Sequence, residues 1–139
     1  MSRQLNGHKV NPANDVISIT VVDEPGSGGA NHAYLITGMA NLSSNPSLQV
    51  LLDAACEDDN ETIQAVLFQN GPIPEAGVNG LTHEVLLEIL IDRIAGFQAG
   101  PFACQANADC LGHLKAAQEI LLNRTRERMA RGVEGTHAK

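Results

Sequence analysis

The last third of the chain constrains the fold most strongly. Apolar residues recur with a helical period on both sides of GFQAGPFAC (Gly96–Cys104), whose glycines and proline favour a turn. The pattern predicts one helix over Leu81–Phe97 and a second from about Phe102 or Cys104 to Arg131, folded back on each other. The first helix is apolar on more than one face, which predicts burial on two sides. In a chain of 139 residues we expect one of those sides to contact another subunit.

The second helix has its own expected boundaries and buried stripe. Pro101 suits a first helical turn and Gly132 suits a helix stop. Its predicted stripe consists of nine residues: Ala103, Asn107, Cys110, Leu111, Leu114, Ala117, Leu121, Arg124 and Met129. At 1.5 Å per residue this helix is roughly 40 Å long, which again indicates association with other subunits.

The segments before residue 61 have a different pattern. Asp15–Asp23 is rich in β-branched residues and predicts a strand, and His32–Thr37 predicts a second one. The glycine-rich EPGSGGAN lies between them, which predicts an antiparallel hairpin. Residues 1–14 are polar, and we expect a loose start. Residues 41–60 read as a loop followed by a short helix, with Ser47 as its expected cap.

The next two segments complete the first 80 residues. Thr62–Phe68 predicts a third strand, and Gln69–Gly80 predicts a structured loop because it is rich in Gly, Pro and Asn. The expected fold class is therefore α+β, with a β-rich part over residues 1–80 and a helical hairpin over residues 81–139. We expect these parts to form one compact unit that assembles as a homo-oligomer.

Charge and composition exclude several function classes. The net charge of −7 argues against binding to a nucleic-acid polymer, whereas a local group of four arginines, at residues 124, 126, 128 and 131, suits a small anion. No apolar run is long enough to span a bilayer and the start is not a signal peptide, so we expect a cytoplasmic protein. Three cysteines without a CxxC pair predict free thiols rather than a disulfide framework or zinc site.

No catalytic or metal-binding motif is recognisable. No two of the five histidines have the i, i+4 spacing of a metal pair, and GSGG (Gly26–Gly29) lacks the context of a phosphate-binding loop and reads as a hairpin turn. The arginine group has two interpretations: a solvated helix end that complements the helix dipole, or a clamp for phosphate oxygens. Phe97 and Phe102 likewise read either as core residues or as a stacking surface for a base.

Several motifs together indicate a family. FQNGPI (Phe68–Ile73), GVNG (Gly77–Gly80), FQAGPFAC (Phe97–Cys104), Asn107-Ala108 and RTRERMARGVEGTH (Arg124–His137) occur in this order. With them, the chain resembles the phage-encoded Thoeris anti-defence proteins of the first type, whose helical hairpin is shared with anti-CBASS cyclic-nucleotide sponges. The strand-loop-strand VVDEPGSGGANHAYLI is similar too, whereas Asn41–Asp59 looks like an insertion.

The resemblance implies sequestration rather than catalysis, without a cofactor. Family members bind cyclic ADP-ribose isomers intact, and some form hexamers with separate sites for cyclic di- or trinucleotides. By resemblance, the signal pocket lies between subunits and uses Phe97 against the adenine, Asn107 on the ribose or base edge, and Arg124 on the pyrophosphate, with Arg128 as a further anion contact. The chain departs from the family at Gln105-Ala106, where Arg-Glu is common.

Two other functions stay open at this point. One is a hydrolase of the same signals, for which Asp109, Glu119 and Glu127 are the available helical carboxylates. The other is a structural oligomerisation module whose arginines are only a solvated helix end.

Overall fold

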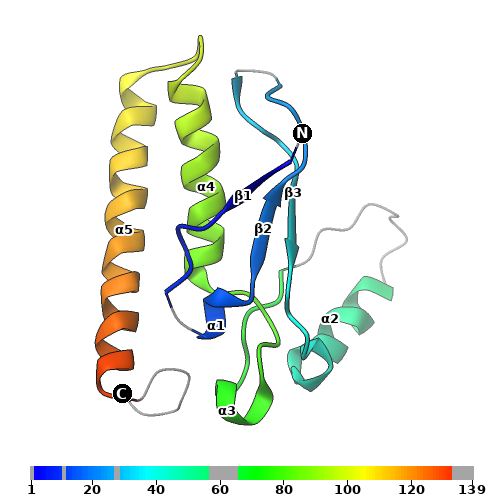
Figure 1. The fold of residues 1–139 in the computed structure, drawn as a ribbon. Helices are drawn as coiled ribbons and strands as arrows, with labels where there is room; N and C mark the ends of the chain where they lie inside the picture. The colour runs from blue at the N-terminus through cyan, green and yellow to red at the C-terminus, as the bar shows by residue number, and fades with distance from the viewer. Residues whose placement is uncertain (1, 11, 27–28, 57–65, 133–139) are drawn as a thin grey trace.

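The computed structural model describes residues 2–10, 12–26, 29–56 and 66–132 (Figure 1). It has a small sheet at the N-terminus and a long helical hairpin at the C-terminus, which confirms the predicted α+β class. In chain order the helices and strands are β1 (Arg3–Leu5), α1 (Pro12–Asp15), β2 (Ser18–Val21), β3 (Tyr34–Thr37), a 3-10 helix (Leu42–Ser44), α2 (Ser47–Cys56), α3 (Ile73–Ala76), α4 (His83–Gln98) and α5 (Gln105–Ala130).

The sheet is antiparallel throughout, in the order β1-β2-β3. The predicted hairpin is confirmed: Ile19 lies opposite Ile36 and Val21 opposite Tyr34. The expectation of a loose start is wrong, because Arg3–Leu5 form β1 along the other edge of β2. A contact 89 residues away fixes this strand, since the Arg3 guanidinium binds both carboxylate oxygens of Asp92 on α4, at 2.8 and 3.0 Å.

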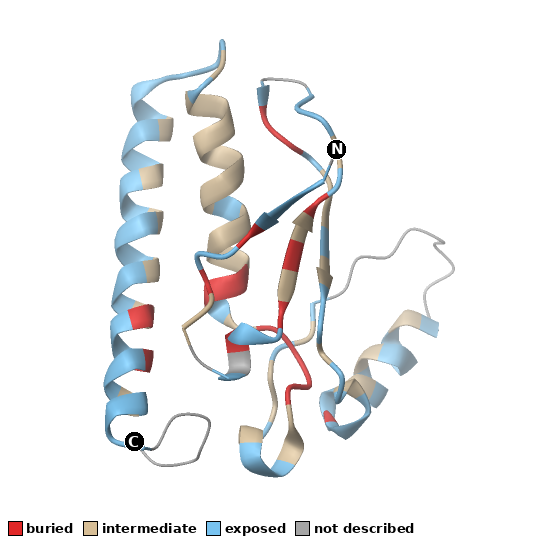
Figure 2. Ribbon diagram, viewed as in Figure 1, coloured by how far each residue is buried: buried red, intermediate tan, exposed pale blue. Residues whose placement is uncertain are grey.

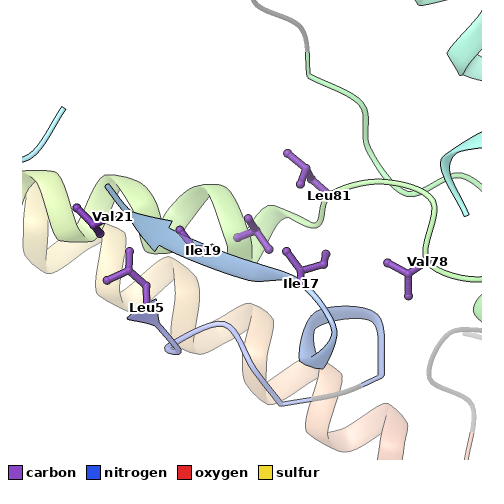
Figure 3. Close-up of a cluster of buried hydrophobic side chains, with 7 residues drawn as sticks. Leu5, Ile17, Ile19, Val21, Val78 and Leu81 are labelled. Atoms are coloured by element: carbon purple, nitrogen blue, oxygen red, sulfur yellow. The ribbon is translucent and has the colours of Figure 1, made fainter. Parts of the chain in front are cut away.

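The core lies between the sheet and α4. Period-two alternation turns Ile17, Ile19 and Val21 toward α4, and all three are at most 1% exposed (Figure 2). Figure 3 shows these side chains together with Leu5, Val78 and Leu81. Fully burying one such side chain contributes about 1.5–3 kcal/mol.

Helix α4 is the middle layer of the molecule. In Figure 1 it lies between α5 and the sheet, so the prediction of burial on two sides is confirmed. Val85 is fully buried in the core, and Leu86 and Ile89 pack against the same cluster. Glu88 accepts hydrogen bonds from the Gly7 backbone N–H and from Gln118 on α5. The second layer on α4 is therefore the sheet of the same chain, and the homo-oligomer stays a prediction that α4 does not require.

Helix α5 begins after Cys104 and ends before Gly132, whose φ of +73° ends the helix as predicted. One finer expectation is wrong. Pro101 lies in the turn before α5 rather than in its first helical turn. The predicted stripe is right in part. Four of its residues are half-buried (Asn107, Leu111, Leu114 and Leu121), and five are exposed (Ala103, Cys110, Ala117, Arg124 and Met129). The other partly or fully buried residues of the helix are Gln118, Leu122, Thr125 and Arg128.

The connection between β3 and α4 is partly as predicted. The short helix α2 is present, but Ser47 is not its cap: the Asn45 side chain accepts the Ser47 N–H at 2.9 Å. Of the predicted strand Thr62–Phe68, residues 62–65 lie outside the described residues, and the rest holds only an isolated bridge from Phe68 to Leu81. The predicted structured loop contains α3.

Candidate functional site

The four residues predicted to bind the signal fall into two pairs. Phe97 lies in the last turn of α4 and Asn107 in the first turn of α5, and both are half-buried near the turn of the hairpin. Arg124 is exposed and Arg128 half-buried near the other end of α5. Asn107 and Arg124 are 17 residues apart on one helix, which separates their backbones by about 25 Å. Within one chain, these residues do not form a single site.

At the hairpin tip, Phe97 has a cationic neighbour. The Arg93 guanidinium carbon lies 5.3 Å from the centroid of the Phe97 ring, one helical turn earlier. Arg93 also donates a hydrogen bond from Nη1 to the Asn31 carbonyl at 2.7 Å. Asn107 donates from Nδ2 to the Phe102 carbonyl at 3.3 Å, while Phe102 itself is 62% exposed. The tip therefore combines an aromatic ring, a guanidinium and an amide.

The glycine-rich connection between β2 and β3 packs against this tip. A Cβ added to Gly96 would lie 3.0 Å from the Ala30 Cα, so glycine permits the close approach of α4 to this loop. Gly29 has a φ of +83°, a backbone conformation that favours glycine, and a Cβ added there would lie at an ordinary contact distance of 3.5 Å from the Gly100 Cα. The interpretation of GSGG as a hairpin turn is confirmed for its described residues, and the loop is also a neighbour of Phe97.

A polar network holds this loop on α4. Asn31, only 7% exposed, donates to the Asp23 carbonyl at 2.7 Å and accepts from Arg3 Nη2 at 2.6 Å. The Tyr34 hydroxyl donates to Asp92 at 2.7 Å, and burial together with that carboxylate raises the pKa of Tyr34. Loss of water raises the pKa of Asp23, but hydrogen bonds from the His32 and Ala33 backbone and from Asn31 outweigh it, so the pKa of Asp23 is lowered.

At the other end of α5, arginines line a hollow of about 300 Å³. Its walls are Arg124, Glu127, Arg128 and Arg131. Three guanidinium groups against one carboxylate make this surface positive, as an anion site requires. Arg126 faces elsewhere and pairs with Glu119 at 3.1 Å. Both interpretations of the arginine group, a phosphate clamp and a solvated helix end, remain compatible with this arrangement.

The FQNGPI and GVNG motifs are joined by hydrogen bonds around Asn79, which we call the Asn79 network. Asn79 is fully buried: its side chain accepts from the Asn70 N–H at 2.9 Å and donates to the Asn70 carbonyl at 2.7 Å. Asn45 donates to the carbonyls of Phe68 and Asn79, both at 3.0 Å. These amides hold loops together, so the motif has a structural role. Since Asn45 lies within residues 41–60, that segment contributes to the Asn79 network.

The helical carboxylates considered for hydrolysis are dispersed along α5. Asp109 accepts from Gln105 at 2.8 Å near the tip, Glu119 is paired with Arg126, and Glu127 lines the arginine hollow. The described part of the chain has no group of three or more His, Cys, Asp or Glu placed to hold a metal ion. The cysteines at 56, 104 and 110 are free and exposed.

Comparison with known proteins identifies a relative of this chain. No protein-family model matches the chain. The chain is 44% identical over 77 residues to a protein named Thoeris anti-defense 1 from Bacillus phage SBSphiJ7. This confirms the resemblance to the Thoeris anti-defence proteins. The match covers 55% of this chain, and it spans about half the length of the relative (54%).

The sequence missed two contributors to the tip. Arg93 sits among the apolar residues of the first helix, and the only signal for it was its i, i+4 spacing to Phe97. Asn31 gave no signal in the sequence, because it acts through its backbone carbonyl, which the β2–β3 connection places beside Arg93.

In the described residues, no helix combines the length and apolarity needed to cross a membrane.

Proposed function

We propose that this chain is a Thoeris anti-defence protein that binds cyclic ADP-ribose-type immune signals and sequesters them without cleavage in the host cytoplasm. The observation that carries the proposal is the 44% identity to Thoeris anti-defense 1. The chemistry of the two ends of the hairpin supports it. An aromatic ring and an amide suit a nucleobase and its ribose, and an arginine-lined hollow suits a pyrophosphate.

The proposed site is shared between two copies of the chain. Asn107 and Arg124 are about 25 Å apart in one chain. Two α5 helices packed antiparallel, with the two-fold axis near residue 115, would set Asn107 of one copy beside Arg124 of the partner subunit. Ile120, 68% exposed and close to that midpoint, supplies an apolar contact for such a pairing. A hexamer built from such pairs is the assembly we propose.

Each residue has a physical role in this proposal. Phe97 stacks on the adenine, and Asn107 hydrogen-bonds the ribose or base edge with its amide. Arg124 and Arg128 bind the pyrophosphate, with guanidinium forks that match phosphate oxygens. Cyclic di- and trinucleotides are a second proposed ligand class, held at separate sites.

The proposal is tested by recovery of the ligand. Purified protein is incubated with glycocyclic ADP-ribose, free ligand is removed by filtration, and the protein is heat-denatured before the released material is analysed by mass spectrometry. We expect intact signal in amounts stoichiometric with sites. Release of a cleaved product would contradict sequestration and indicate a hydrolase.

A hydrolase is the second candidate. Of the three carboxylates considered for hydrolysis, Glu127 lines the arginine hollow. In that case Glu127→Gln would abolish cleavage while binding persists, because it keeps the shape of the side chain and removes its basicity. If neither intact nor cleaved signal is recovered from a stable oligomer, cyclic trinucleotides are tested in the same assay. Failure with those as well would leave the structural module.

A further inference from the structure

We propose that Arg93 is a positioning residue of the signal site: it holds the Phe97 ring in the orientation against which the adenine stacks. The inference rests on the proposed function, because it concerns the same site. Its starting point is the guanidinium carbon of Arg93, 5.3 Å from the Phe97 ring centroid. A cation at this distance over a ring face is attracted by the electrons of the ring.

Arg93 is itself held in place by the sheet side of the molecule. Its Nη1 donates to the Asn31 carbonyl at 2.7 Å, and Asn31 is 7% exposed. Asn31 is fixed in turn by Asp23 and by Arg3, whose guanidinium also binds Asp92 on α4. The side chain that covers Phe97 is therefore anchored through a buried residue, which distinguishes it from a mobile surface arginine.

The close contact between Gly96 and Ala30 fixes the same geometry independently. It presses the loop against the last turn of α4, one residue before Phe97. With one ring face covered by Arg93, a base that stacks on Phe97 uses the opposite face. A ring already fixed in place loses little freedom on binding, so Arg93 contributes to affinity through preorganisation.

The test compares Arg93→Met, which keeps the length of the side chain and removes its charge, with Arg126→Met. Arg126 is an exposed α5 arginine that pairs with Glu119 outside the arginine hollow, so its loss is a matched change of charge. Affinity for glycocyclic ADP-ribose is measured by calorimetry. We expect roughly a three- to thirtyfold loss for Arg93→Met. Arg126→Met should stay within twofold of wild type, and Arg93→Lys should recover part of the loss.

A double-mutant cycle separates positioning from a general structural role. If Arg93 acts through the ring, Arg93→Met in a Phe97→Ala background causes no further loss of affinity. An equal loss in both backgrounds would overturn the inference, as would a single variant within twofold of wild type. Circular dichroism of each variant checks folding, and should Arg93→Met fail to fold, Arg93→Lys and Arg93→Gln enter the same cycle. A wild-type protein that retains no signal would overturn the proposed function and this inference with it.

Discussion

A site shared between two copies predicts that two inactive variants restore each other. Phe97→Ala removes the stacking ring at the tip, and Arg124→Ala removes a guanidinium about 25 Å away along α5. Each alone should weaken binding by about 2 kcal/mol or more, which is roughly thirtyfold. In a shared site, however, the tip comes from one copy and the arginine from the other.

The size of the restoration follows from random assembly. A site is intact only when its tip comes from an Arg124→Ala chain and its arginine end from a Phe97→Ala chain. Each condition holds for half of the chains in an equal mixture, so about one quarter of the sites should be intact in any oligomer built from this pairing.

The assay uses co-expressed variants with two different tags, purified through both tags so that only mixed assemblies remain. Retained glycocyclic ADP-ribose per chain is measured against wild type, with correction for the composition of the assembly. A mixture of Phe97→Ala with the Phe97→Ala, Arg124→Ala double variant is the control and should restore nothing. If the complementary mixture also restores nothing while the wild type binds, the shared site is wrong.

Three further predictions concern the fold. Ile19→Ala, at a fully buried position, should lower the free energy of unfolding by about 2–5 kcal/mol in urea titrations, whereas Val50→Ala, at a position 69% exposed, should change it little. Asn79→Ala should lower the free energy of unfolding by about 2 kcal/mol or more in the same titrations, because it leaves the buried hydrogen-bond partners of Asn79 unsatisfied. An unchanged urea midpoint would contradict the structural role of the Asn79 network. The pKa of Asp23 is lowered in the folded state, so its stabilisation is fully present above its ordinary pKa of 3.8 and is lost as the pH falls through its folded value. Thermal unfolding of Asp23→Asn should therefore depend less on pH below about 4 than that of wild type, and identical slopes would refute the assignment.

The helical hairpin could be predicted because its signals are local. Apolar periodicity, the turn near Pro101 and the stop at Gly132 lie within the elements that they define. Strand β1 could not, because Arg3–Leu5 has one apolar residue and depends on Asp92, which lies far along the chain. Such long-range contacts leave no pattern in a short window of sequence.

The candidate site was predictable in composition but not in arrangement. Phe97, Asn107 and Arg124 follow from the resemblance, and counting residues along one helix separates the last two. Arg93 was missed because its role depends on the Asn31 carbonyl, which the β2–β3 connection brings to α4. The Asn79 network was missed because its hydrogen-bond partners are largely backbone groups, which every residue carries.

The central place of α4 also sets an order of events during synthesis. The apolar face of the sheet is complete once Thr37 has been made, but its cover, α4, ends at Gln98. At roughly 5–20 residues per second the ribosome takes about 3 to 12 s to add the residues between them. During that time Ile17, Ile19 and Val21 lack the helix that buries them. The first half of the nascent chain is therefore the part that most needs a chaperone, and truncation before α4 should yield an aggregating fragment.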